Sequence, residues 1–98
     1  MQRRGYVYIM ATWTGDVLYT GVTARLEERV YEHREKLIEN SFSSKYNCTK
    51  LVWYKEFSGI EQAIEEEKRI KAGNRWNKTQ LISELNPQWE DMWDSIKR

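Results

Sequence analysis

The feature that most constrains the fold is the segment over residues 19–33, which reads YTGVTARLEERVYEH. It predicts the end of a strand, a glycine turn and the first turns of a helix. Thr23 is a suitable N-cap, because its hydroxyl can accept from the free N–H groups of a first helical turn. Apolar residues recur at helical spacing at Leu26, Val30 and Leu37. The sequence therefore predicts an amphipathic helix over residues 24–37.

Two polar residues border the apolar stripe of this predicted helix. Arg29 and His33 lie one turn apart, beside the stripe and not opposite it. A guanidinium and an imidazole next to a buried face, directly after a strand, are consistent with a functional site. They are equally consistent with the polar flanks of an ordinary amphipathic helix, and these two residues leave both interpretations open.

Composition indicates a single globular domain over residues 1–98. Apolar residues make up 40% and charged residues 32% of the 98 residues, which is typical of a folded soluble protein. No apolar run approaches the roughly 18 residues needed to span a bilayer, and no signal-type segment follows the N-terminus. Cys48 is the single cysteine, which excludes an intrachain disulfide and a cysteine zinc site. We expect a cytoplasmic location and no membrane partner.

A β-hairpin is predicted near the N-terminus. Residues 5–11 indicate a strand covered on both faces, Gly15 a turn, and residues 17–21 a second strand. A hairpin folded symmetrically about residues 13 and 14 would place Tyr8 opposite Tyr19, so that the two phenols are neighbours. A register slip of one residue would separate them, and the sequence does not decide the register.

The remaining elements follow from pattern and punctuation. After a polar loop over residues 39–44, a strand is predicted over 51–57, with Ser58 as the cap of a helix over 60–71. A shorter helix is predicted from Arg75 to the Asn86-Pro87 break, and a final amphipathic turn in the tail. The predicted inward residues are Ile60, Ala63, Ile64 and Ile70, then Leu81, Ile82 and Leu85, then Trp89, Met92, Trp93 and Ile96.

Glu67 interrupts the predicted inward stripe of the 60–71 helix. It lies three residues from both Ile64 and Ile70, at a position where leucine is expected. A carboxylate there must be partnered, neutralised or placed at the mouth of a cleft. The alternative is a helix-edge glutamate that reaches solvent or pairs with a nearby arginine.

Two short motifs, in this order, resemble the GIY-YIG nuclease family. They are Tyr6-Val7-Tyr8 and, eleven residues after Tyr8, Tyr19-Thr20-Gly21. Arg29 and His33 follow on the first helix and Glu67 on the later one. The resemblance is to the small single-domain bacterial branch related to the nuclease module of the UvrC excinuclease. Three positions depart from the family pattern: Tyr6 replaces a glycine, Thr20 an isoleucine and Val22 a lysine found in several members.

The resemblance implies an α+β fold, a three-stranded antiparallel sheet flanked by helices in the order β-β-α-β-α-α. It implies metal-dependent cleavage of DNA with one divalent cation, Mg²⁺ or Mn²⁺, in DNA repair or recombination. The catalytic residues it implies are Tyr8, Tyr19, Arg29 and His33, with Glu67 as the metal ligand and Asn86 as a supporting residue.

These residue types suit phosphodiester hydrolysis. A hard cation with a mostly water shell needs only one carboxylate, here Glu67. Arg29 can hold a phosphate oxygen, and His33 can orient the base or relay a proton. Tyr8 or Tyr19 would accept the proton of the attacking water, although a phenol with a pKa of about 10 needs nearby positive charge to do so. We therefore expect at least one tyrosine close to both cations.

Two other functions compete with the nuclease. The GIY-YIG fold can serve as a non-catalytic nucleic-acid-binding module, which the missing lysine at Val22 favours, or the aromatic C-terminal segment can bind a protein. A net charge of +1 decides neither. The residues that we predict to contact the DNA backbone, unless they are simply solvated helix faces, are Arg25, Arg34, Lys71 and Lys78.

Overall fold

A three-stranded antiparallel sheet forms the centre of the computed structural model, which describes residues 4–38 and 41–97. The central strand, β1 (Gly5–Ala11), pairs with β2 (Leu18–Thr23) on one side and β3 (Lys50–Phe57) on the other. β1 is covered on both faces, as its uninterrupted run of aromatic and β-branched residues predicts.

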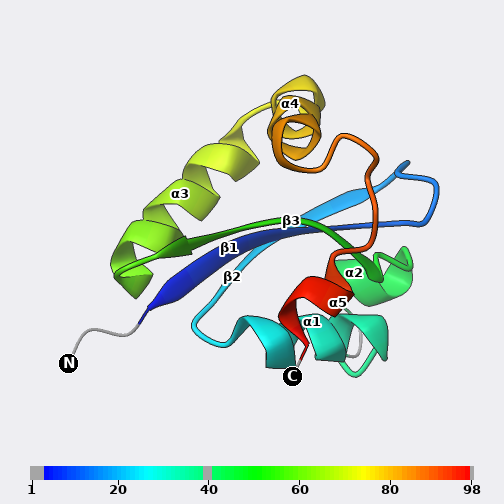
Figure 1. Ribbon diagram of the computed structural model, residues 1–98, viewed down its shortest axis with the longest axis horizontal. Coiled ribbons are helices and arrows are strands. Elements are labelled where there is room, and N and C mark those ends of the chain that lie inside the picture. Colours follow the sequence, from blue (N-terminus) through cyan, green and yellow to red (C-terminus); the bar gives the residue numbers. More distant parts are fainter. Residues whose placement is uncertain (1–3, 39–40, 98) are drawn as a thin grey trace.

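Helices cover both faces of this sheet (Figure 1). α3 (Ile60–Ala72) and α4 (Arg75–Leu85) pack on one face, over Val7 and Ile9 of β1. The opposite face, which carries Tyr8, is covered by α1 (Leu26–Arg34), α2 (Phe42–Lys45) and α5 (Trp93–Ile96). Neighbouring residues of a strand point to opposite faces, so β1 contributes side chains to the hydrophobic core on each face of the sheet. The predicted fold class is confirmed, with two short helices added to it.

The register of the hairpin differs by two residues from the symmetric one. Tyr8 lies opposite Gly21, and Met10 lies opposite Tyr19. The predicted pairing of Tyr8 with Tyr19 was therefore wrong, because the loop extends to residue 17, with Gly15 at a φ of 80°. A shift of two keeps both phenols on one face of the sheet, as diagonal neighbours.

The helix after β2 begins later and ends earlier than predicted. Thr23 is still in the strand, and its hydroxyl accepts a hydrogen bond from the backbone N–H of Arg25. Arg25 is the N-cap residue, with no side-chain cap. Lys36 adopts a φ of 55° soon after the last helical turn. Leu37 is consequently outside the helix and 59% exposed, so its predicted place in the stripe was wrong.

Three other local predictions were wrong. The 39–44 segment contains the start of a short helix, α2, which Ser41 caps by accepting from the N–H of Ser44. Gly59, and not Ser58, is the N-cap of α3. Ile64 and Leu85, both predicted to point inward, are exposed. The buried residues of α3 are Ala63, Glu67 and Ile70, and the buried residue of α4 is Ile82.

The C-terminal segment, residues 87–97, contacts the hydrophobic cores on both faces of the sheet. Trp89 packs against the core under α3 and α4, whereas Met92, Trp93 and Ile96 pack against the core under α1. The N–H of Met92 donates to the carbonyl of Leu51 on β3. In the described ranges, no helix has the length and apolar character needed to cross a bilayer.

Candidate active site

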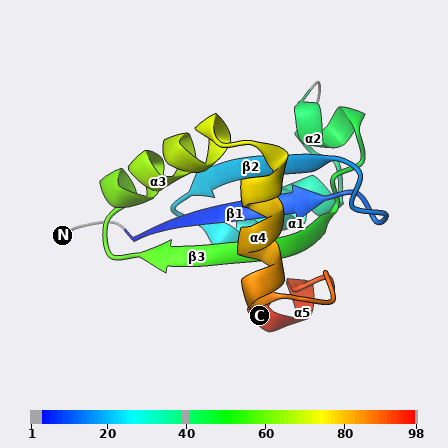
Figure 2. The same cartoon turned by 90° about the horizontal axis from the view of Figure 1, so that it is seen from above.

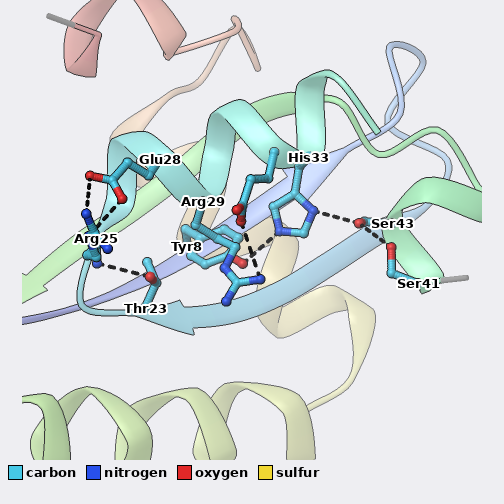
Figure 3. A network of polar contacts seen from close by, with 9 residues as sticks. Tyr8, Thr23, Arg25, Glu28, Arg29, His33, Ser41 and Ser43 are labelled. Carbon is cyan, nitrogen blue, oxygen red and sulfur yellow. Dashed lines mark hydrogen bonds and ion pairs between the residues drawn. The ribbon is translucent and has the colours of Figure 1, made fainter. Parts of the chain in front are cut away.

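A buried chain of hydrogen bonds joins β1, α1 and α2. The hydroxyl of Tyr8 lies 2.8 Å from Nε2 of His33, and Nδ1 of His33 lies 2.6 Å from Oγ of Ser43. The chain continues to Ser41, 3.2 Å from Ser43. Tyr8 and His33 are each 2% exposed. Figure 3 shows Tyr8 reaching towards His33 and Arg29, which both project from α1.

Gly21 gives Tyr8 the space to reach this position. It lies opposite Tyr8 in the hairpin, and a Cβ built on Gly21 would come within 2.4 Å of the Tyr8 hydroxyl. The phenol therefore occupies the volume that any side chain at position 21 would fill. A glycine that follows the second tyrosine by two residues is thus a steric requirement of the site.

Tyr19 and Arg29 complete the cluster. The ring of Tyr19 lies 6.3 Å from that of Tyr8 and 5.1 Å from that of His33, measured between centroids. The charge of Arg29 helps to lower the pKa of His33 and opposes the burial that raises the pKa of Tyr8. Its guanidinium pairs at 3.6 Å with Glu32, and its side chain is 43% exposed. The cluster thus combines two phenols, a buried imidazole and a solvent-accessible cation.

Burial controls protonation within the cluster. Desolvation, helped by the charge of Arg29, lowers the pKa of His33 to about 4. Desolvation also raises the pKa of Tyr8, helped by the neighbouring Tyr19 and opposed by Arg29. The charge of Arg29 by itself therefore does not bring the pKa of Tyr8 below its ordinary value. At neutral pH, Tyr8 is a protonated phenol hydrogen-bonded to a neutral imidazole.

Glu67 lies on the helix that covers the other face of the sheet. It is buried on α3, and its Oε2 lies 2.8 Å from Nζ of Lys71. No hydrogen bond or ion pair within residues 4–38 and 41–97 joins it to the two phenols. The predicted break in the apolar stripe is real, and the partner of the carboxylate is a lysine one turn later on the same helix.

A hollow at the β2 edge of the sheet is lined by residues of the helices that cover both of its faces. Tyr19 lines it from β2, Phe42 from α2, Lys71 from α3 and Lys78 from α4. In the view of Figure 2, α3 runs along the β2 side of the sheet and α2 lies near the start of β2. The partner of Glu67 and the more exposed of the two phenols therefore border one open space.

The family model for the GIY-YIG catalytic domain matches residues 4–80 of this sequence. The chain belongs to the GIY-YIG family. A UPF0213 protein of Syntrophus aciditrophicus (strain SB) is 31% identical over 85 residues, covering 87% of this chain and 95% of the relative. The solution NMR structure of a UPF0213 protein from Bacillus halodurans matches with a TM-score of 0.57 and 25% identity, covering 97% of this chain and 99% of that one.

Two of the three departures from the GIY-YIG motif, Thr20 and Val22, lie on the face of β2 opposite the tyrosines. Thr20 and Val22 alternate with Tyr19 and Gly21 along β2, so they point to the α3 side. Thr20 is buried, and Val22 packs against the core there. Their replacement of isoleucine and lysine leaves the tyrosine face of this GIY-YIG hairpin unchanged.

The side chain of Asn86 makes three hydrogen bonds that hold α4, β3 and the C-terminal segment together. A bulge in β3 leaves Val52 without a partner on β1, and the Asn86 amide donates to the Val52 carbonyl at 3.0 Å. It also donates to the carbonyl of Glu90 and accepts from its N–H. Asn86 thus joins α4, β3 and the tail, away from the tyrosine cluster.

The predicted DNA-contacting residues separate into two groups. Lys71 and Lys78 line the hollow beside Tyr19. Arg34 instead pairs with Asp91 and lies 5.1 Å from the centroid of Trp93, so it anchors the tail. Arg25 is exposed at the start of α1, where it pairs with Glu28 at 2.7 Å.

Ser43 is the site residue that the sequence analysis missed. It is 1% exposed and contacts His33 from α2. The one local signal was the serine at position 41, whose capping pattern places Ser43 in the first turn of a helix. Nothing in the sequence pairs that turn with α1.

Proposed function

We propose that this GIY-YIG protein is a metal-dependent endonuclease that hydrolyses DNA phosphodiester bonds. Membership of a family of catalytic nuclease domains supports a nuclease. The observation that carries the proposal is the buried Tyr8–His33 hydrogen bond, with Tyr19 and Arg29 beside it. A role in DNA repair or recombination, in the cytoplasm, is the setting that we predict.

We assign proton acceptance from the attacking water to Tyr19. Tyr19 borders the open hollow, whereas Tyr8 is buried and its pKa is raised. Tyr8 and His33 would hold the Tyr19 ring in place by packing against it. Arg29, with its accessible guanidinium, would stabilise the charge that develops on a phosphate oxygen.

Glu67 fits the role of ligand to one hard divalent cation. The Glu67 side chain is 12% exposed, so its carboxylate is in contact with water, while its Oε2 pairs with Nζ of Lys71 at 2.8 Å. An oxygen donor open to water suits Mg²⁺ or Mn²⁺, which keep several waters. When bound, such a cation polarises a phosphate oxygen or a water molecule.

The test is DNA cleavage by purified protein with Mg²⁺ or Mn²⁺. Supercoiled, branched and single-stranded DNA are incubated with the wild type, with Glu67→Gln and Tyr19→Phe, and with the matched variants Glu65→Gln and Tyr31→Phe. We expect the first two substitutions to reduce the cleavage rate by about 10²-fold or more. The matched variants, at exposed positions on α3 and α1, should retain it. Equal cleavage by all five proteins would refute the assignment.

Val22 supports one alternative, a DNA-binding module that does not cleave. It places an apolar side chain where several family members carry a lysine, and that side chain is used for packing. Salt-sensitive DNA binding by the wild type, without product in either metal, would establish this alternative.

A further inference from the structure

We propose that Phe42, the first residue of α2, and Tyr46, its C-cap residue, form a stacking site for an unpaired nucleobase beside the cleaved phosphate. This inference rests on the proposed nuclease function and specifies its substrate: DNA with an unstacked nucleotide next to the cut, as in single strands, flaps, gaps or branches.

The first observation is a continuous series of rings leading out of the candidate active site. Phe42 is stacked on Tyr19 with ring centroids 6.4 Å apart and an interplanar angle of 25°. Tyr46 follows, with its ring centroid 4.7 Å from that of Phe42. The series therefore runs from the phenol to which we assign proton acceptance to the surface of α2.

The second observation is that the outer rings are exposed. Phe42 is 49% and Tyr46 43% exposed, although both belong to residue types that gain stability by burial. A core function does not explain two adjacent half-exposed rings, one on the first residue of a four-residue helix and one on its C-cap. Rings with one open face are what proteins use to stack successive bases.

The third observation is the charge around the rings. Nζ of Lys45, the last residue of α2, lies 5.5 Å from the centroid of the Tyr46 ring. Lys71 and Lys78 line the hollow with Phe42, and no carboxylate is among its lining residues in the described part of the chain. Rings bordered by cations match a base attached to a negatively charged backbone, and an apolar protein partner would not require them.

Duplex geometry then identifies the substrate class. Within a duplex, each base is covered on both faces by its neighbours, so a protein ring stacks only on a base that has left the stack. Phe42 contacts Tyr19 directly, so the stacked base would belong to a nucleotide adjacent to the phosphate held at the Arg29 cluster. The enzyme would therefore favour DNA that is already unpaired at that position.

The experiment compares two probes in metal-free buffer by fluorescence anisotropy. One probe is a fluorescein-labelled oligothymidylate of about twelve nucleotides, a length within the usual range of single-strand sites. The other is the same backbone without bases. The proteins are the wild type, Phe42→Leu, Tyr46→Leu, Phe42→Trp and the control Tyr31→Leu, which removes an exposed ring from α1. Circular dichroism establishes that each variant is folded.

We expect the wild type to bind oligothymidylate about tenfold or more tightly than the base-free probe. Phe42→Leu and Tyr46→Leu should lose about tenfold in affinity for oligothymidylate and little for the base-free probe. Phe42→Trp, which restores an aromatic face, and Tyr31→Leu should bind like the wild type. Equal wild-type affinity for the two probes, or equal losses on both, would overturn the stacking site.

Cleavage assays separate this inference from the proposed function. Metal-dependent cleavage without any base-dependent binding would leave the nuclease standing and refute the stacking site. Base-dependent binding that Phe42→Leu abolishes, without cleavage in Mg²⁺ or Mn²⁺, would support the stacking site and contradict the nuclease.

Discussion

The phenol of Tyr8 occupies the space in which a side chain at position 21 would have to lie. Gly21 faces it across the β1–β2 pair, and a Cβ there would come within 2.4 Å of both Cζ and the hydroxyl oxygen of Tyr8. The direction of the Tyr8 side chain, and with it the bond to His33, therefore depends on the absence of one methyl group.

Gly21→Ala should displace Tyr8 and break its bond to His33. Overpacking of this kind costs about 1–3 kcal/mol of unfolding free energy, and DNA cleavage should fall with the displaced cluster. Urea denaturation measures the first effect and the cleavage assay the second. Gly73→Ala is the control, because its Cβ would meet nothing closer than 3.2 Å; equal losses in the two variants would contradict the steric account.

The free energy of unfolding should fall as the pH is lowered from 7 to 4. The pKa of His33 is about 4 in the folded protein and about 6.5 in an unfolded chain. Between these values the unfolded state binds a proton that the folded state does not, so acidification favours unfolding, by on the order of 3 kcal/mol. Urea denaturation at several pH values measures this slope. His33→Asn should show a flatter slope, and an unchanged slope would show that His33 is not buried as a neutral imidazole.

Ser43→Ala should destabilise the protein by about 1–3 kcal/mol, because it leaves Nδ1 of His33 buried without a partner. The protonated Tyr8 hydroxyl needs an acceptor, and Nε2 is within its reach, so we expect the Nδ1–H tautomer of His33 in the wild type. Nitrogen-15 NMR of the imidazole reports the tautomer. Ser44→Ala, which removes no side-chain hydrogen bond of the described residues, should leave both stability and tautomer unchanged.

Arg29→Lys should reduce the cleavage rate with little effect on stability. Its surface pair with Glu32, at 3.6 Å, contributes little, whereas a lysine lacks the planar pair of donors that fits a phosphate. A loss of about 10²-fold is expected. Arg69→Lys, at an exposed pair on α3, should cleave like the wild type; a rate for Arg29→Lys equal to it would remove Arg29 from the proposed mechanism.

Lys78→Ala should weaken DNA binding, whereas Arg34→Ala should lower stability. Lys78 lines the hollow, so its loss should weaken DNA binding and reduce the slope of log affinity against log salt by about one. Arg34 is engaged with Asp91 and Trp93, so its loss should lower the unfolding free energy by about 1 kcal/mol and leave the slope unchanged. A lower slope of log affinity against log salt for Arg34→Ala would show that Arg34 contacts DNA.

Local sequence determined the elements and the motif. An uninterrupted run of aromatic and β-branched residues marked β1, helical spacing marked α1 and α3, and the Asn86-Pro87 pair marked the end of α4. These signals act over a few residues, where side-chain periodicity and backbone preference dominate. The order of the two tyrosine motifs was visible for the same reason, and it predicted the family and the sheet.

Tertiary structure decided which side chains meet. The loop over residues 12–17 set the register and placed Gly21, not Tyr19, opposite Tyr8. The docking of α2 against α1 brought Ser43 to His33, and its docking against β2 brought Phe42 to Tyr19. The packing of α3 against the sheet gave Glu67 its buried place. The sequence alone determined what each segment forms, because local interactions suffice for that. The burial, protonation state and contact partners of a side chain depend on contacts between segments distant in the sequence. These contacts form only in the folded tertiary structure.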